Sequence, residues 1–171
     1  MNKQANRAET MISHLKMLVM DVDGTLTDGK IYMGDNGEIM KSFSAKDGFA
    51  IHEQLPKAGI VPAIITGRQS TIVENRAREL GIELLYQGVK DKRALLDRIT
   101  MDHSVRLSEI AYIGDDDNDL EAMRSVLIVG CPSDASENVR RIAHFISTKK
   151  GGEGAVREFI EWIIANGSST S

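Results

Sequence analysis

The strongest constraint on this chain is a regular alternation between short apolar runs and longer amphipathic segments. The apolar runs have the length and composition of buried strands, and the segments between them carry apolar residues at helical spacing. A chain that alternates in this way folds as a doubly wound α/β domain, a Rossmann-like parallel sheet with helices on both faces. Strands are expected at residues 17–20, 61–65, 82–86, 110–113, 126–129 and 144–146, and helices at 47–57, 70–80, 91–101, 119–125 and 135–142.

The composition fits a single domain over residues 1–171, with a core from about 15 to about 165 and a Gly-rich C-terminal tail from about 149 to 171. Hydrophobic residues make up 42% of the chain and charged residues 27%, which is enough apolar material for a core and unlike a disordered segment. The net charge of −4 argues against a protein that wraps nucleic acid or lies on an anionic membrane.

Neither a secretory signal nor a membrane span is expected. The apolar run at 17–20 stops at Asp21, and the run at 159–164 is broken by Glu161, well short of the roughly 18 apolar residues that a spanning helix needs. The single cysteine, Cys131, cannot form an intramolecular disulfide, which fits a reducing compartment. We therefore expect a cytoplasmic protein.

One segment departs from the alternation of strand and helix. Residues 30–33 and 38–43 have strand composition and flank Gly34-Asp-Asn-Gly37, whose Asn-Gly pair favours a tight turn. A β-hairpin at about 29–44 is therefore expected directly after the first strand. This position favours a flap over a functional site, and a plain surface hairpin is the alternative.

Two acidic clusters follow expected strands. Asp21-Val-Asp-Gly-Thr25 ends the first strand, where side chains two positions apart share a face, and Gly114-Asp-Asp-Asp-Asn-Asp119 follows the strand at 110–113. Parallel strands end at one edge of a sheet, so the clusters should meet there, and their repulsion calls for a hard cation such as Mg²⁺. A capping loop is the alternative for the first cluster, and a calcium loop is a weaker one for the second.

Two further polar positions are expected at the same edge. Thr66, with Gly67 and Arg68, follows the strand at 61–65, where a hydroxyl and free N–H groups can cradle an anion. An ordinary helix cap is the alternative for Thr66. Lys92 opens the helix at 91–101, where a cation opposes the helix dipole, and neutralising a phosphate would explain its presence.

These positions together resemble the four motifs of the haloacid dehalogenase superfamily of phosphohydrolases. The resemblance implies a phosphoric monoester hydrolase that works through an aspartyl-phosphate, with Asp21 as the nucleophile. It implies that Asp23 protonates the leaving alkoxide and then activates water, while Thr66 and Lys92 hold the phosphoryl oxygens. The motifs are matched by Asp21-x-Asp23-Gly-Thr, Thr66, Lys92 and Gly-Asp115-Asp116-x-x-Asp119.

The same resemblance implies a magnesium site. Mg²⁺ would be held by Asp21, the backbone carbonyl of Asp23 and Asp115, and would offset the repulsion between nucleophile and phosphate. Asp116 and Asp119 would orient metal-bound waters and the motif lysine rather than bind the ion.

Within the superfamily the chain resembles the capless family of 3-deoxy-D-manno-octulosonate 8-phosphate phosphatases, which serve lipopolysaccharide inner-core biosynthesis. The segment between the hairpin and the strand at 61–65 is short and mostly helical, so it leaves no room for a cap. The resemblance implies a homotetramer whose hairpins pack at its centre, a neighbouring subunit as lid, and a Gly-rich tail that reaches an adjoining site. The matching segments are Asp21-Val-Asp-Gly-Thr-Leu-Thr-Asp-Gly29, Ile31-Tyr-Met-Gly34, Lys46-Asp-Gly48, Ile64-Ile-Thr-Gly-Arg68, Leu85-Tyr-Gln-Gly88 and Gly151-Gly-Glu-Gly-Ala-Val-Arg-Glu158.

The sugar acid of that family carries a carboxylate besides its phosphate, which calls for donors beyond the phosphoryl cradle. Arg76 could equally lie on a solvated helix face. The chain departs from many relatives at His52, where they carry Arg. The positions that match the family's substrate contacts are Asp23, Ser44, Ala45, Lys46, Asp47, Gly48, Arg68, Arg76 and Lys92.

Two alternative functions stay open. Phosphatases of a nine-carbon ketodeoxy sugar acid 9-phosphate share the chemistry but tend to carry Glu where Arg68 stands, which favours the eight-carbon substrate. A non-catalytic tetramerisation module of the sialate cytidylyltransferase type is disfavoured because all four motifs are intact.

Overall fold

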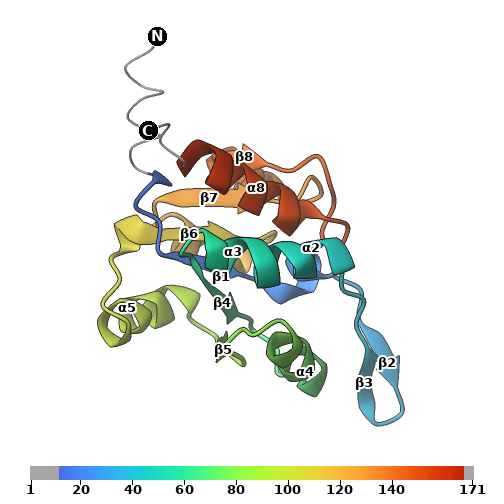
Figure 1. Cartoon of the computed structure of the whole chain (residues 1–171). Coiled ribbons are helices and arrows are strands. Elements are labelled where there is room, and N and C mark those ends of the chain that lie inside the picture. Colours follow the sequence, from blue (N-terminus) through green and yellow to red (C-terminus); the bar gives the residue numbers. More distant parts are fainter. Residues whose placement is uncertain (1–11, 168–171) are drawn as a thin grey trace.

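The computed structural model describes residues 12–167 and is built on a six-stranded parallel sheet (Figure 1). Its strands are β1 Met17–Met20, β4 Val61–Ile65, β5 Leu84–Tyr86, β6 Ile110–Ile113, β7 Ile128–Cys131 and β8 Phe145–Ile146. Their order is β5-β4-β1-β6-β7-β8, so the chain adds strands on one side of β1 and then on the other. The doubly wound fold class is therefore confirmed. A hairpin is the only β-structure outside this sheet in the described part of the chain, and no cap domain is evident there.

Helices cover both faces of the sheet (Figure 1). Because successive strand residues point to opposite faces, Leu18 and Met20 of β1 belong to one core, whereas Met17 and Val19 belong to the other. The first core lies under α2 Ala45–Phe49, α3 Leu55–Lys57, α4 Thr71–Glu79 and α8 Ala155–Gly167, and the second under α5 Lys92–Asp102, α6 Leu120–Met123 and α7 Glu137–Ile142.

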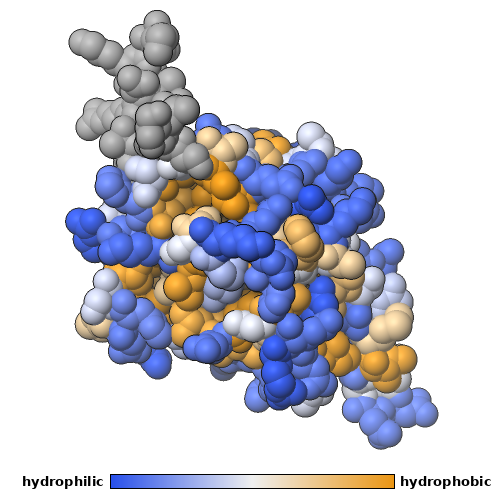
Figure 2. Space-filling view, viewed as in Figure 1, coloured by the Kyte–Doolittle hydropathy of each residue, from blue (hydrophilic) through white to orange (hydrophobic). Residues whose placement is uncertain are grey.

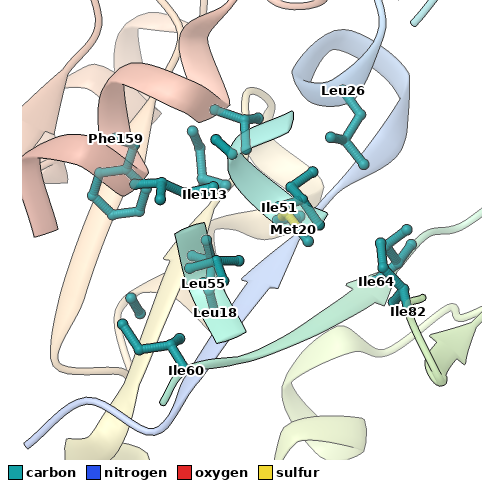
Figure 3. Close-up of a cluster of buried hydrophobic side chains, with 14 of the residues drawn as sticks. Leu18, Met20, Leu26, Ile51, Leu55, Ile60, Ile64, Ile82, Ile113 and Phe159 are labelled. Carbon is teal, nitrogen blue, oxygen red and sulfur yellow. The ribbon is translucent and has the colours of Figure 1, made fainter. Parts of the chain in front are cut away.

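The first core is shown in Figure 3. Leu18 and Met20 of the central strand lie among Ile51, Leu55 and Phe159, and all five side chains are buried. Burying a side chain of this size stabilises the fold by about 1.5–3 kcal/mol relative to leaving it exposed. This face of β1 is thus held by apolar packing up to the end of the strand.

Several element boundaries differ from the expected ones. The helix expected at 47–57 begins earlier, because Ser44 caps it by accepting the N–H groups of Lys46 and Asp47, and helical backbone continues through residues 50–54 into α3. The strand expected at 126–129 lies at Ile128–Cys131, because Val126 still donates its N–H to Met123 in the turn that ends α6. The helix expected at 91–101 lies one residue later. The structure shortens the elements expected at 70–80, 82–86, 119–125, 135–142 and 144–146.

The expected Gly-rich tail at 149–171 is wrong over most of its described length. Only residues 151–154 form a glycine-rich turn, and α8 follows directly and packs into the first core. Val156, Phe159, Ile160 and Ile163 are buried at the spacing of one helix face, a pattern that the preceding glycines obscured. The helix ends beside Ile12, while residues 168–171 of that tail, like residues 1–11, lie outside the described part.

The expected hairpin is confirmed as β2 Tyr32–Gly34 and β3 Gly37–Met40, which pair antiparallel. Gly34 pairs with Gly37, whose φ of +112° is a conformation that favours glycine. The hairpin forms its own two-stranded sheet and projects from the body of the molecule (Figure 1). Apolar surface shows on it in Figure 2, and its exposed large hydrophobic residues are Ile31, Met33, Ile39 and Met40.

No helix within residues 12–167 combines the length and the apolar character needed to cross a membrane.

Candidate active site

The loops that follow β1 and β6 meet at the carboxyl edge of the sheet, as expected. The Thr25 hydroxyl donates to Asp115 Oδ1 over 3.0 Å and links the loops directly. Gly24 has φ +98°, and a Cβ at this position would lie 2.0 Å from Asp115 Oδ2. The close approach of the two loops therefore requires glycine at position 24.

Three carboxylates converge where these loops meet. Oxygens of Asp21, Asp115 and Asp119 lie within 4.8 Å of one another. Asp119, which was expected to orient metal-bound waters and Lys92 rather than to bind the ion, offers an oxygen to the same cluster. Its side chain is fully buried, and its Oδ2 has no hydrogen-bond partner among the described residues.

The electrostatics of this cluster favour a bound cation. Burial, followed by the charge of Asp119, raises the pKa of Asp21 to about 8. Burial likewise raises the pKa of Asp115 to about 6, with the charges of Asp119 and Asp116 adding to the effect. Three oxygen donors and an orphaned carboxylate oxygen fit a hard divalent cation such as Mg²⁺.

Lys92 lies between two members of this cluster. Its Nζ donates to Asp21 Oδ1 and to Asp119 Oδ1, each over 2.6 Å, and the side chain is 2% exposed. Burial opposes the charged form, but the two carboxylates hold the pKa of Lys92 above its usual value. The unfavourable position of a lysine at the start of α5 is therefore offset by direct ion pairs. The Asp91 side chain caps that helix by accepting the Ala94 N–H at 2.8 Å.

A tyrosine that sequence reasoning missed supports the same cluster. The Tyr112 hydroxyl, on β6, donates to Asp119 Oδ1 over 2.7 Å, and both residues are fully buried. An apolar strand pattern gives no reason to single out its one hydroxyl.

Thr66 lies at the end of β4 and is buried. Its N–H donates to the Tyr86 carbonyl at 3.0 Å, and its carbonyl accepts the Val89 N–H at 3.1 Å, so the loop is tied to the end of β5. The alternative role as an ordinary helix cap does not hold, because α4 starts at Thr71 and is preceded by Ser70 as its cap position.

Asp23 lies in a second group of charges that connects the sheet edge with the hairpin. Its Oδ1 accepts a hydrogen bond from the Lys41 ammonium, and its Oδ2 lies 3.8 Å from Arg68 Nε. Lys41 Nζ also lies 2.8 Å from Glu38 Oε1, and Arg68 Nη2 lies 3.7 Å from the same oxygen. Sequence reasoning found Asp23 and Arg68 but neither residue of the hairpin. No local pattern marks these two residues, because positions three apart in a strand do not share a face.

Several expected substrate contacts are engaged elsewhere in this chain. Asp47 is 1% exposed, and its Oδ1 accepts the Arg157 N–H at 2.8 Å, so it caps α8 instead. Gly48 is buried against Arg76, which pairs with Glu79 at 2.8 Å on the face of α4. Ala45 and Lys46 are exposed beside the Ser44 cap.

One further expectation is corrected at this edge. Asp116 is exposed and caps the following turn through the Asp117 N–H, so the contact with Lys92 is made by Asp119 alone of the two. The Gly-rich turn packs against the loop that follows β1 in its own chain: Gly152 donates its N–H to the Thr25 carbonyl at 3.1 Å. A Cβ at Gly151 would lie 1.9 Å from the Gly24 carbonyl oxygen.

Comparisons with known proteins converge on one family. No family model matches the chain. It is 40% identical over 152 residues to the 3-deoxy-D-manno-octulosonate 8-phosphate phosphatase KdsC of Yersinia pestis, covering 89% of this chain and 81% of the relative. The crystal structure of the corresponding phosphatase from Moraxella catarrhalis, in complex with a magnesium ion, a phosphate ion and a KDO molecule, superposes with a TM-score of 0.88. It is 41% identical, and the match covers 94% of this chain and 92% of that one. The cobalt-bound phosphatase of Haemophilus influenzae is 33% identical with a TM-score of 0.87, over 92% and 91% of the two chains.

Proposed function

The chain belongs to the 3-deoxy-D-manno-octulosonate 8-phosphate phosphatase family, and on that premise we propose how its residues perform the reaction. It is a Mg²⁺-dependent phosphoric monoester hydrolase that converts 3-deoxy-D-manno-octulosonate 8-phosphate to the free sugar acid and phosphate. The observation that carries the mechanism is Lys92, held at 2.6 Å from both Asp21 and Asp119 where three carboxylates meet.

The first step is attack on phosphorus by Asp21. One of its carboxylate oxygens forms the new P–O bond, and the bond between phosphorus and the sugar oxygen breaks. Asp23, two residues further on and partly exposed, gives its proton to the departing alkoxide. Lys92 and Thr66 hold the phosphoryl oxygens while negative charge shifts onto them.

Asp21, Asp115 and the carbonyl of Asp23 would hold Mg²⁺, whose positive charge would screen the nucleophile from the phosphate dianion. The chain's own contribution is a preformed site. Thr25 fixes the Asp115 carboxylate at 3.0 Å, and Tyr112 fixes Asp119 at 2.7 Å. Neither carboxylate has to be reoriented when substrate binds.

The second step returns the enzyme to its starting state. A water molecule attacks the phosphorus of the aspartyl-phosphate, Asp23 takes its proton, and the P–O bond to Asp21 breaks. Phosphate is released, and the nucleophile is again a carboxylate beside Lys92.

Arg68 is proposed to recognise the sugar acid. Its side chain is 48% exposed, and its ion pairs with Asp23 and Glu38 are longer than hydrogen bonds, so it can turn toward a substrate carboxylate. An arginine at this position supports the eight-carbon substrate over the nine-carbon one. Arg76, paired with Glu79 and lying 5.6 Å from the Phe43 ring centre, is a weaker candidate.

A neighbouring subunit is proposed to complete the site in a cytoplasmic homotetramer. The supporting observation is the projecting hairpin, whose Met33 is 61% and Ile39 66% exposed. Apolar side chains that gather on one small element are typical of a surface that another chain covers. Static light scattering would test the assembly, and a fully active monomer would exclude the neighbour as a lid.

A substrate panel tests the function. Phosphate release would be measured for 3-deoxy-D-manno-octulosonate 8-phosphate, the nine-carbon 9-phosphate and simple sugar phosphates, each with Mg²⁺ and with EDTA. We expect the highest kcat/KM on the eight-carbon substrate, its loss with EDTA and its return with Mg²⁺. Preference for the nine-carbon ester, or the absence of turnover on every ester, would contradict the proposal.

A further inference from the structure

Lys41 is a buried lysine to which the motifs assign no role. It directly follows β3, and its side chain is only 1% exposed. Its ammonium group donates to Asp23 Oδ1 and lies 2.8 Å from Glu38 Oε1. Burial alone would lower its pKa, but the hydrogen bonds to Asp23 and Glu38 raise it, so the charge is retained.

The position of this ammonium is itself fixed from the body of the protein. Glu38 accepts a hydrogen bond from the Ser70 hydroxyl over 2.5 Å, and the Ser70 N–H donates to Gln87 Oε1 over 2.9 Å. A lysine side chain loses much rotamer freedom when it is ordered in this way. Favourable contacts must offset this loss of entropy. Lys41 has two, with Asp23 and with Glu38, and Asp23 belongs to the site.

The two oxygens of Asp23 are thereby made different. Oδ1 is hydrogen-bonded to Lys41, whereas Oδ2 lies 3.8 Å from Arg68 Nε, too far for a hydrogen bond. Oδ2 is the oxygen left to give a proton to the leaving group and to take one from water. A carboxylate that acts in proton transfer must be aimed at its target as well as present.

We propose that Lys41 is a positioning residue that the hairpin supplies to Asp23, and that its ion pair aims Oδ2 at the leaving-group oxygen. This inference rests on the proposed function of Asp23 as general acid and base. It makes the hairpin part of the reaction as well as part of a subunit contact. Loss of the ammonium leaves Asp23 in place but free to rotate.

The choice of leaving group tests this proposal. The value of kcat/KM covers steps only as far as cleavage of the substrate ester, so it reports the acid role of Asp23 without the later base role. A sugar alkoxide needs a proton to leave, whereas 4-nitrophenolate from 4-nitrophenyl phosphate does not. If Asp23 is wrongly oriented, hydrolysis of the sugar phosphate should therefore slow more than hydrolysis of 4-nitrophenyl phosphate.

Lys41→Met keeps most of the side-chain length and removes the charge. We expect kcat/KM on the sugar phosphate to fall at least about 10-fold more than on 4-nitrophenyl phosphate, with partial recovery in Lys41→Arg. Lys30→Met is the matched control: this hairpin lysine is 72% exposed and pairs with Asp28. It should leave both values within about twofold.

An equal loss on both esters, or no loss on either, would overturn the proposal. Should Lys41→Met fail to fold, Glu38→Gln carries the same test, because it weakens the anchor of Lys41 without removing it. A smaller selective loss on the sugar ester is then expected, and a uniform loss would again overturn it. The proposed function is judged separately, by the wild-type enzyme's preference in the substrate panel.

Discussion

The acidic edge of the sheet and the β2–β3 hairpin contribute to one site but are held in place in opposite ways. At the edge, Asp21, Asp119 and Lys92 are all buried. Asp21 directly follows β1, and Lys92 begins α5. Two hydrogen bonds of 2.6 Å join Lys92 to the two carboxylates. The hairpin strands pair only with each other and expose apolar side chains. Polar contacts of Glu38 and Lys41 link the hairpin to the edge.

This difference separates two requirements of the reaction. A nucleophile needs a fixed position, which a central strand packed on both faces provides. The hairpin is different, because a two-stranded ribbon is marginally stable on its own. Its orientation should depend on what covers its exposed face, so assembly can influence proton transfer without disturbing the nucleophile.

The largest effect should come from the edge itself. Asp21→Asn keeps the shape of the side chain but removes the nucleophile, and we expect kcat to fall at least about 10³-fold. Steady-state phosphate release with saturating Mg²⁺ measures this. Asp117→Asn, a change at an exposed carboxylate bonded to Ser136, is the control and should stay near wild type. Retained turnover in Asp21→Asn would exclude an aspartyl-phosphate.

Lys92→Met should reduce both activity and stability. It leaves Asp21 and Asp119 buried without their cation, and breaking a buried pair in this way costs about 3–5 kcal/mol. We expect kcat/KM to fall about 100-fold and urea unfolding to shift to lower concentration. Lys57→Met, at an exposed pair with Glu53, should change neither, and a stable Lys92→Met would argue against the tight ion-pair geometry at this edge.

Substitutions on the exposed apolar side chains of the hairpin should weaken subunit association first, and the loss of activity should follow from it. We expect Met33→Ser combined with Ile39→Ser to weaken subunit association and to lower activity about 10-fold at dilute enzyme, with recovery at high concentration. Light scattering and activity against concentration would be measured together. Met101→Ser, which changes another exposed methionine on α5, is the control. Concentration-independent activity in the double variant would separate the hairpin from catalysis.

The smallest expected effect is a pH dependence of stability, to which the buried carboxylates of the edge contribute. Because the pKa values of Asp21 and Asp115 are raised to about 8 and about 6, the folded protein binds more protons than the unfolded chain above the usual aspartate pKa. Without metal, stability should therefore decrease as pH rises from about 4 to about 8. Mg²⁺ favours the ionised carboxylates, so the rise in Tm on adding it should be larger at about pH 8 than at about pH 5.5.

Thermal unfolding with EDTA and with Mg²⁺ at both pH values would measure this effect. Lys41→Met should preserve it, because this lysine pairs with Asp23 and Glu38 and not with Asp21 or Asp115. An effect of Mg²⁺ that does not change with pH would contradict the electrostatic description of the cluster.

Much of the edge was predictable from the sequence, for a physical reason. Asp21, Asp115 and Thr66 each follow an apolar strand, and parallel strands bring such positions together whatever lies between them. Lys92 was recognisable because a cation opposes the dipole at a helix start. Strand and helix types followed from period, and most errors fell at boundaries where a turn and an element share residues. The exception is α8, a whole helix that was missed because glycines precede it.

The contacts that were missed follow no spacing rule. Lys41 reaches Asp23 only because the chain returns to the edge at the end of β3, and Tyr112 was indistinguishable from the apolar residues around it on β6. Asp47 matched a substrate-contact motif, yet its carboxylate caps α8, more than a hundred positions away along the chain. Long-range polar contacts of this kind depend on the assembled fold and have no local pattern.

The meeting of Ile12 with Gly167, where a Cβ on the glycine would lie 3.2 Å from Ile12 Cγ2, has an architectural consequence. These first and last described residues lie at the far end of the molecule from the hairpin (Figure 1). A short linker between them would make the backbone a ring, and new ends could be opened at an exposed turn such as the one at Ser104. The order in which the elements are synthesised could thus be permuted while their places in space stay the same.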